Sequence, residues 1–482
     1  MANYTYIRPE YISALPLWEL VKDCVAGSKS VKDKGIRYLP KPDPTNDSAE
    51  NTERYNALLN RAMFLNVTGR TRKGLIGAVF RKMAEMDLPV DVEYLKENAT
   101  GDGTSLDQLS KSAVGECLDT GRGGFFVDYP TVETDGAGIP TRAQSQGKQA
   151  HIHLYDACQI INWRTQVIDG VKKLTMIVLA ECYSEDEGDE FNYETKKQYR
   201  VLTLDSGRYR HRLWKDGDDQ PSFDSYPTDF NKKTFDHIPF HFFGAEENTP
   251  DIDKAPLEDL AHVNILHYGN SATVEESGVI SSQPTLFFTT DIDQEEFAKW
   301  NPNGIQIGST CGYSLGKNGT AVMVQASEGQ LARTLMQDKE NQMLMIGARI
   351  VQQSGQNETA EAARIRYSSD NSVLGTVAGN VSEAIVLAIL DAWRFMASGE
   401  PAQNKVVFWL NQEFFDEAMD AQMILAQVQL WQQGLIAKKD LRVNLRQAAI
   451  IEADRTDEDI DADREKEPPV ESGGEVITDE DE

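Results

Sequence analysis

Apolar residues recur at helical spacing along three segments in the second half of the chain. The first begins at Pro256, which suits the first position of a helix, and runs to about Ser277. The second covers Ser327–Val351 and opens with Ser and Gln three residues apart, the pattern of a capping box. The third ends at Met396, and its apolar stripe contains Leu374, Val377, Ala378, Val381, Ile385, Ala388 and Ala392. The pattern therefore predicts three long helices.

Two shorter segments separate these helices. A non-helical insert between the first and second contains the strand-like runs Gln283–Asp291 and Gly304–Gly308. Between the second and third lies Gln352–Glu358, which is polar and contains neither Lys nor Arg. Two long helices cannot bury a small β insert that they carry between them inside one compact subunit. We therefore expect this part to protrude and to pack against copies of the same chain.

The rest of the chain changes from helical to strand-like and back. Residues 1–100 have the pattern of helices joined by loops, and the middle third has a β pattern with a hairpin signal at Asp205–Gly207. A short strand follows at Val406–Leu410, and a final helical pair lies within Asn411–Asp454. The β-type runs are Phe125–Tyr129, Gln149–Tyr155, Ile160–Trp163, Leu174–Cys182, Tyr199–Leu204, Tyr209–Trp214 and Ile238–Phe243. The fold class is therefore predicted to be α+β.

Composition is that of a globular protein with room for more than one domain. The chain has 482 residues, of which 40% are hydrophobic, and we expect no transmembrane span and no secretion signal. The five cysteines have no metal-ligand spacing, so reduced, half-buried thiols in a protein made in the cytoplasm are expected. They are Cys24, Cys117, Cys158, Cys182 and Cys311.

The formal net charge of −29 is the strongest compositional signal. From Glu452 to the end there are 15 Asp or Glu and 3 Lys or Arg, a net of −12. Residues 455–482 are therefore predicted to be a disordered acidic tail, with docking of a partner as the alternative. Such acidity argues against tight nucleic-acid binding, which needs Lys and Arg to displace counterions.

The most basic part of the chain is Arg61–Lys82. Its cations lie on a helical pattern, and a basic helical face is usually solvated or pairs with a neighbouring subunit. If this basic face has a binding function in so acidic a protein, pairing with a neighbouring subunit is favoured, and contact with DNA is the weaker alternative.

Motifs for catalysis, cofactors and metals are mostly absent from the sequence. Gly308–Thr320 has the wrong spacing for a P-loop, and GRGGFF at Gly121–Phe126 precedes a strand instead of opening a helix. The histidines supply at most two convergent metal ligands, at His151 and His153. The chain is therefore predicted to be no enzyme, with no cofactor and no metal. One weak alternative is a metal-dependent nuclease, which rests on Asp186, Asp189, Glu194 and Lys196.

Two glycines lie inside the third helical pattern. Gly375 and Gly379 are four residues apart and so share one face, although a helical glycine costs about 1 kcal/mol relative to alanine. We interpret them as a site of close helix packing, either within the subunit or with a neighbouring subunit.

An ordered set of short motifs resembles the portal proteins of tailed bacteriophages. Each motif alone is weak, but together they follow the family order from about residue 10 to residue 400. The set comprises YLPKP (Tyr38–Pro42), RAMFLNVTGRTRKGLIGAVFRK (Arg61–Lys82), GRGGFFVDYP (Gly121–Pro130), YDACQIINWR (Tyr155–Arg164), IPFHFFG (Ile238–Gly244), PLEDLAHVNILHY (Pro256–Tyr268) and ETAEAARIR (Glu358–Arg366). The terminal helices and the tail match only in general character.

The resemblance implies a portal-like subunit with a mixed α/β wing, long stem helices, a small β-containing clip and a helical crown. Carried onto this chain, these parts are a wing at residues 1–250, a stem helix at 251–279, a clip at 280–326, a second stem helix at 327–351, a tunnel loop at 352–357, a long wing helix and strand at 358–410, crown helices at 411–454 and the acidic tail at 455–482.

The resemblance also implies a site and a set of partners. The tunnel loop would line a DNA channel with Gln352, Gln353, Ser354, Gly355, Gln356 and Asn357. The expected partners are copies of the chain in a dodecamer, double-stranded DNA, the terminase packaging motor, head-tail connector or adaptor proteins, and major capsid and scaffolding proteins. The expected location is the portal vertex of the virion. The alternative of an acidic adaptor or scaffolding protein without a channel stays open.

Overall fold

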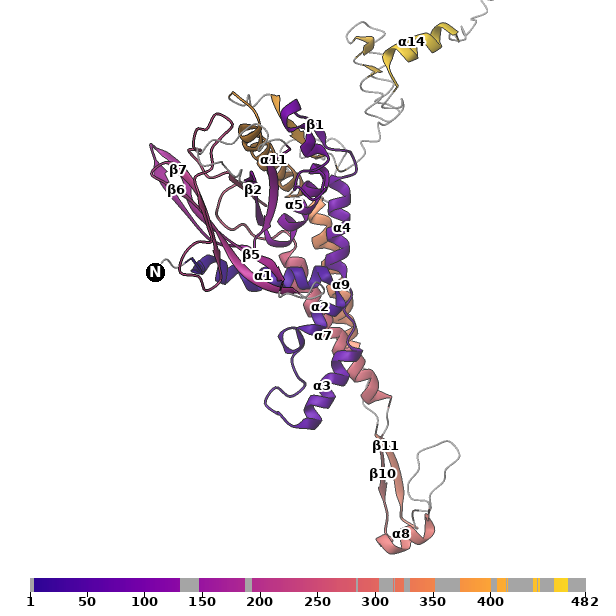
Figure 1. The fold of residues 1–482 in the computed structure, drawn as a ribbon. Helices are drawn as coiled ribbons and strands as arrows, with labels where there is room; N and C mark the ends of the chain where they lie inside the picture. Colours follow the sequence, from indigo (N-terminus) through magenta and orange to yellow (C-terminus); the bar gives the residue numbers. More distant parts are fainter. Residues whose placement is uncertain are drawn as a thin grey trace, which may run out of the picture. The chain divides into compact units, whose positions relative to one another are not determined.

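The computed structural model describes residues 4–130, 147–186, 193–282, 285–302, 315, 317–324, 330–351, 373–399, 405–412, 414, 437–439, 441–442 and 455–466. The chain divides into two compact units, Met1–Gln412 and Glu413–Glu482. The first unit contains helices and antiparallel strands in separate layers (Figure 1), which confirms the α+β prediction.

The elements of the first unit alternate between helical and β regions. Its helices are α1 (Pro9–Ala26), α2 (Ser28–Asp33), α3 (Ala49–Arg61), α4 (Val67–Val79), α5 (Leu106–Thr120), α7 (Glu258–Ser281), α8 (Gln294–Trp300), α9 (Gln330–Val351) and α11 (Val373–Met396), with the short 3-10 helices η1 (Gly35–Arg37) and η2 (Val90–Lys96). Its strands are β1 (Glu85–Asp87), β2 (Arg122–Asp128), β3 (His151–Asp156), β4 (Ile160–Ile168), β5 (Val171–Asp186), β6 (Tyr193–Asp205), β7 (Arg208–Lys215), β8 (Phe223–Ser225), β9 (Phe240–Gly244), β10 (Thr285–Thr289), β11 (Thr320–Val324) and β12 (Val407–Trp409).

Two antiparallel sheets form the β region. Strands β4 to β8 follow one another in a five-stranded meander, and a three-stranded sheet has the order β3-β2-β9. The predicted hairpin at Asp205–Gly207 is confirmed as the turn between β6 and β7, where Ser206 and Gly207 have φ values of 49° and 78°. Positive φ at both central positions is the geometry that a tight hairpin turn requires, and Gly adopts it without strain.

The core lies where α11 packs on the three-stranded sheet. Strand β2 is buried along Arg122–Val127, and the rings of Phe240 and Phe243 from β9 lie directly over its two glycines. Gly123 and Gly124 are therefore required by the close approach of these rings, since a Cβ atom at either position would overlap a ring carbon. Helices α5 and α11 both contact β2 and each other.

Helix α11 is the apolar centre of this layer. By length and composition it could cross a membrane, and 56% of its most apolar window is buried inside the protein. Because its stripe from Leu374 to Ala392 packs against the sheet and α5, burial in the protein core accounts for its composition.

The second unit contains the helix α14 (Asp457–Lys466). Its carboxylate Asp461 forms ion pairs with Lys438 and Arg442. The prediction of disorder from residue 455 is therefore wrong for Asp457–Lys466, because basic side chains of the preceding segment compensate part of its negative charge. The crown helices expected at residues 411–454 lie largely outside the described residues.

Candidate assembly surface: the α7–α9 helix pair

Helices α7 and α9 pack against each other as an antiparallel pair beside α4. Asn264, near the start of α7, accepts a hydrogen bond from the Thr68 hydroxyl of α4 at 2.9 Å. Gly347, near the end of α9, lies against Thr71 of the same helix α4. The start of α7 and the end of α9 therefore lie at the same level.

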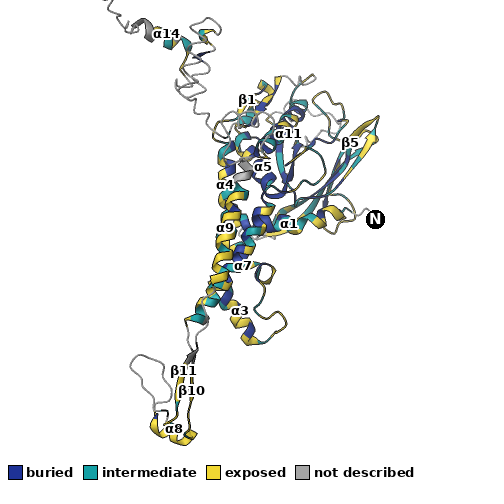
Figure 2. Cartoon of the chain, turned by 180° about the vertical axis from the view of Figure 1, so that it is seen from behind, coloured by how far each residue is buried: buried dark blue, intermediate teal, exposed yellow. Residues whose placement is uncertain are grey.

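The contact between the two helices is buried, and α7 is also covered by α1, α3 and α4. Tyr268 and Ala272 of α7 and Met343 of α9 are almost fully covered, and His267 Nε2 lies 3.2 Å from Glu340 Oε1 across the interface. Outside this contact most described positions of α9 are exposed, so α9 shows a long exposed side (Figure 2).

The exposed side of α9 is unusually poor in charge. Among its described residues, 11 positions are exposed and only Arg333 and Asp338 are charged. The large apolar side chains at the exposed positions of α9 are Leu331 (73% exposed), Leu335 (43%), Leu344 (69%) and Met345 (62%), and helix geometry places Leu344 on a different part of the surface from the other three. A solvated helix face normally carries charged residues, so this face has the character of one that another chain covers.

The hairpin that joins α7 to α9 also exposes large apolar side chains. Within the described residues, strands β10 and β11 pair only with each other, in the register Phe287↔Val322, and these two side chains are 57% and 54% exposed. An isolated two-stranded hairpin is marginally stable in water. The hairpin follows the end of α7 directly. Because it is isolated, it needs support that its own strands do not supply.

A short acidic helix lies within the same hairpin segment. Asp293 caps α8 by accepting a hydrogen bond from the Glu296 backbone N–H at 2.8 Å, and Glu295 and Glu296 stand in the first turn. No described residue of α8 is buried, and Trp300 is 49% exposed. The segment therefore presents carboxylates next to an exposed aromatic side chain.

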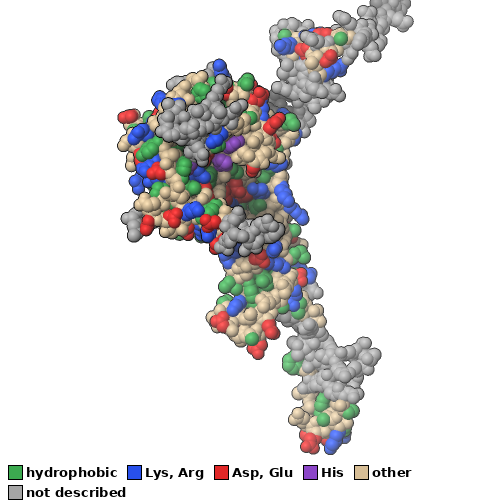
Figure 3. Space-filling view, in the orientation of Figure 1, with side chains coloured by type: hydrophobic (Ala, Val, Ile, Leu, Met, Phe, Trp, Pro, Cys, Tyr) green, Lys and Arg blue, Asp and Glu red, His purple; other side chains and the backbone are tan. Residues whose placement is uncertain are grey.

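Lys and Arg side chains gather over α4 at one edge of the first unit (Figure 3). Arg70 and Lys73 are exposed there, whereas Arg72 turns inward. Of the predicted basic stretch, Arg70 and Lys73 thus lie exposed on α4, next to the α7–α9 pair, and the exposed side chains of Arg61, Arg81 and Lys82 lie outside α4.

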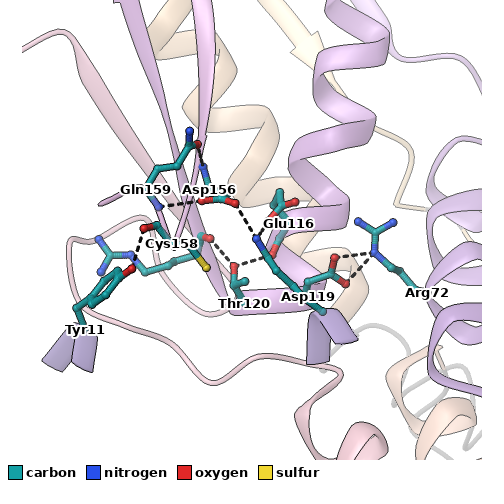
Figure 4. Close-up of polar contacts among 10 residues, drawn as sticks. Tyr11, Arg72, Glu116, Asp119, Thr120, Asp156, Cys158 and Gln159 are labelled. Carbon is teal, nitrogen blue, oxygen red and sulfur yellow. Dashed lines mark hydrogen bonds and ion pairs between the residues drawn. The ribbon is translucent and has the colours of Figure 1, made fainter. Parts of the chain in front are cut away.

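A polar joint fixes the helices around this pair to the sheet region (Figure 4). Lys22 Nζ of α1 lies 3.1 Å from Glu116 of α5 and 2.7 Å from Asp156 at the end of β3. Burial alone would lower the pKa of Lys22, but the two carboxylates outweigh burial and raise this pKa. The lysine is thereby held charged between two elements that the sequence separates widely.

The joint continues from α5 to α4. Arg72 Nε donates to both carboxylate oxygens of Asp119, at 2.7 and 2.8 Å (Figure 4). Burial raises the pKa of Asp119 to about 6 despite the opposing effect of Arg72. Helix α4, and with it the support of α7 and α9, is therefore tied to the core through a largely buried ion pair.

A second buried arginine has no such partner. Arg122 is 1% exposed, and its three guanidinium nitrogens have no hydrogen-bond partner in the described part of the chain. Its guanidinium stacks on Trp163 at 4.3 Å and on Phe242 at 5.0 Å from the ring centroids. Burial lowers the pKa of Arg122 to about 9.

Arg122→Met should leave the free energy of unfolding unchanged or raise it by about 1–4 kcal/mol, because an apolar side chain avoids the cost of a buried charge. Arg72→Met is the matched comparison and should lower it by about 3 kcal/mol, since Asp119 would lose its buried counter-charge. Urea unfolding followed by circular dichroism compares the two variants. A large loss in Arg122→Met would mean that stacking on Trp163 and Phe242 outweighs desolvation.

The residues predicted for a channel, Gln352, Gln353, Ser354, Gly355, Gln356 and Asn357, lie outside the described residues. Of the two helical glycines, Gly379 lies against the side chain of Gln412, whose Nε2 would be 3.1 Å from a Cβ atom introduced at this glycine. Among the described residues, the neighbour at Gly379 is therefore Gln412, which follows β12, and contact of Gly375 and Gly379 with a neighbouring subunit stays a prediction.

Two residues of the weak nuclease pattern, Glu194 and Lys196, take part in surface ion pairs. Lys196 contacts Glu185 at 2.7 Å and Glu194 at 3.1 Å across β5 and β6, and Asp189 lies outside the described residues. No group of three His, Cys, Asp or Glu among the described residues is arranged to hold a metal ion. Lys196 is thus neutralised by side chains of its own sheet.

The exposed face of α9 is the feature that the periodicity of the sequence did not single out. Leu, Met, Asn, Gln and Thr are spread around the helix, so no polar stripe marks an outer side. The signal that could have found it is the placement of charge. Asp338, Lys339 and Glu340 stand together, and the rest of α9 contains only Arg333 and Arg349 as charged residues.

Comparisons with known proteins cover different parts of the chain. A family model described as Domain of unknown function (DUF4055) matches residues 256–397, from α7 into α11. No curated protein matches the sequence. Among solved structures, a chain of the virion of the native gene transfer agent (GTA) particle is similar, with 12% identity, a TM-score of 0.38 and coverage of 81% of this chain and 92% of that one. A chain from the neck of the empty GTA particle, computed with C6 symmetry, is similar with the same values.

Proposed function

We propose that this chain is the portal subunit of a tailed bacteriophage or a related particle. About twelve copies form a closed ring at one capsid vertex, and double-stranded DNA passes through its centre during packaging and ejection. The observation that carries the proposal is the exposed, nearly uncharged face of α9 on a helix pair that ends in an isolated hairpin. Copies of the same chain cover the helix faces and support the hairpin.

The charge of the chain suits a conduit. Twelve copies at −29 each, 12 × −29, give the ring a formal charge of about −348. Carboxylates repel phosphates over roughly 8 Å at physiological ionic strength, so DNA slides without being held. Residues 352–357, which contain no charged side chain, form the loop that touches DNA through exchangeable hydrogen bonds.

The proposed partners follow from the same arrangement. The hairpin segment, with its carboxylates and Trp300, docks the terminase motor before the genome is complete and head-tail connector proteins afterwards. The major capsid and scaffolding proteins surround the ring in the virion. The chain acts without catalysis of its own, so purified protein incubated with DNA and Mg²⁺ or Mn²⁺ should leave the DNA intact.

Substitution of Leu344 and Met345 by Glu tests the assembly surface. Both side chains are exposed, at 69% and 62%, so the folded subunit should lose no more than about 0.5 kcal/mol. The double variant should nevertheless fail to form rings, because repeated carboxylates would be buried at every interface. Native mass measurement of the full-length protein gives the readout.

The matched control is the pair Val167→Glu and Val171→Glu, near the end of β4 and at the start of β5, where the side chains are 71% and 57% exposed. This control should assemble as the original chain does. Rings of normal mass from the α9 variant would show that α9 does not form the interface, whereas loss of rings from both pairs would point to a general effect of charge.

A further inference from the structure

A cluster of ionisable side chains joins α11 to the segment that leads into β9. Asp391 of α11 is 2% exposed and accepts hydrogen bonds from His241 Nε2 at 2.7 Å and from Arg394 at 2.8 Å. His237 Nε2 lies 3.0 Å from the same carboxylate. Neither the assembly surface nor the proposed channel uses these residues.

The position of His237 determines its protonation. Its Nε2 faces Asp391, and its Nδ1 lies 3.0 Å from Asp236 Oδ1. A neutral imidazole has one N–H and one acceptor nitrogen, and carboxylates only accept at neutral pH. Both contacts can therefore be hydrogen bonds only when the ring carries two protons and a positive charge.

We propose that His237 is a proton-dependent clamp, which holds the C-terminal half of α11 to the segment before β9 when charged and loosens this junction when neutral. The clamp lies at a packed junction: the tilted rings of Phe235 and Phe395 have centroids 4.6 Å apart, and the Phe230 backbone N–H donates to the Arg394 carbonyl at 2.9 Å. A change at His237 therefore reaches the core packing of α11.

The ionisable groups around His237 come from several elements. Its own segment supplies Asp236, β9 supplies His241, α11 supplies Asp391 and Arg394, and Lys173 of β5 lies 4.0 Å from Asp236. Burial lowers the pKa of His237, but the contacts with Asp391 and Asp236 outweigh burial and Arg394, and the pKa is raised. The neutral ring keeps at most one of the two carboxylate contacts. With its proton on Nδ1 it donates to Asp236, and Nε2, which lies 3.2 Å from Arg394 Nη1, then accepts from this guanidinium instead of donating to Asp391.

The direction of the pH dependence follows from the raised pKa. The clamp is complete below the ordinary histidine pKa of about 6.5 and is lost as the pH rises through the raised value in the folded protein. The junction should therefore be tighter in mildly acidic than in mildly alkaline solution.

Hydrogen exchange of the full-length protein, read by mass spectrometry between about pH 6 and about pH 8.5 and corrected for intrinsic exchange, tests the clamp. Peptides containing Phe235–Phe243 and Ala388–Phe395 should lose protection at the higher pH. His237→Gln should abolish this difference. Asp236→Asn should move the transition to lower pH, and because the Asp236 side chain is 78% exposed, this substitution should not unfold the chain. His262→Gln, on an exposed histidine of α7, should behave as the original chain does.

Protection that does not change with pH in the original chain would overturn the proposal. So would a transition that Asp236→Asn leaves in place, because the titrating group would then not be His237. The test does not depend on ring formation or on DNA, and its result therefore leaves the proposed function untouched.

Discussion

Gly124→Ala should lower the free energy of unfolding by about 3 kcal/mol, close to what abolishes folding in a marginally stable protein. The new Cβ would lie 2.2 Å from Phe240 Cζ, on a ring that is 4% exposed. Neither β2 nor this ring can shift without disturbing α11, which packs on the same sheet. Thermal unfolding or urea titration of the purified variant measures the loss.

Gly74→Ala is the matched control, since the substitution is the same and its surroundings are opposite. Nothing lies within 4 Å of a Cβ at Gly74, in the exposed part of α4. Alanine should therefore stabilise the protein by about 1 kcal/mol through its higher helix propensity. Equal effects at the two positions would contradict this explanation of the core.

Asp391→Ala should cost about 3–5 kcal/mol, because it leaves positive side chains without a counter-charge inside the protein. The carboxylate contacts His237, His241 and Arg394. Burial would raise its pKa, but the hydrogen bonds from His237 and His241 hold this pKa well below the usual range. The loss should be measured at about pH 6, where His237 is charged and its contact with Asp391 is complete.

Asp47→Ala provides the comparison for the loss of an aspartate in an ion pair. Asp47 is 92% exposed and pairs with Lys41 at 3.2 Å, so its removal should cost less than about 1 kcal/mol. Asp391→Asn keeps the shape of the side chain and should still lose most of the stability, because an amide cannot balance the charge. A small effect of both Asp391 variants would mean that water satisfies the cluster.

The arrangement of helices was predictable where one periodic pattern dominates. The helical segments from Pro256 and Ser327 correspond to α7 and α9, and the third corresponds to α11. Helix α4 spans Val67–Val79, and the apolar spacing of this segment does not by itself fix where the helix starts. The Asn66 side chain sets its start by accepting from the Gly69 N–H at 2.7 Å, which is a local contact that apolar spacing does not reveal.

The ion pairs that connect distant elements of the first unit could not be predicted from the sequence. The joint of Lys22, Glu116 and Asp156 comes from three elements far apart in the chain, and ion pairs across such distances leave no spacing pattern. Likewise, composition predicted a disordered tail but not the pairing of Asp461 with Lys438 and Arg442. The uncharged polar loop at 352–357 remains a prediction about function.

Electron microscopy of the purified full-length protein tests the central claim most directly. We expect rings with a central hole wide enough for a DNA duplex, in which α9 of each subunit contacts a neighbouring subunit and the hairpins of adjacent copies lie together. Particles that remain monomers or dimers at every protein concentration, or closed assemblies without a central opening, would contradict the proposed function.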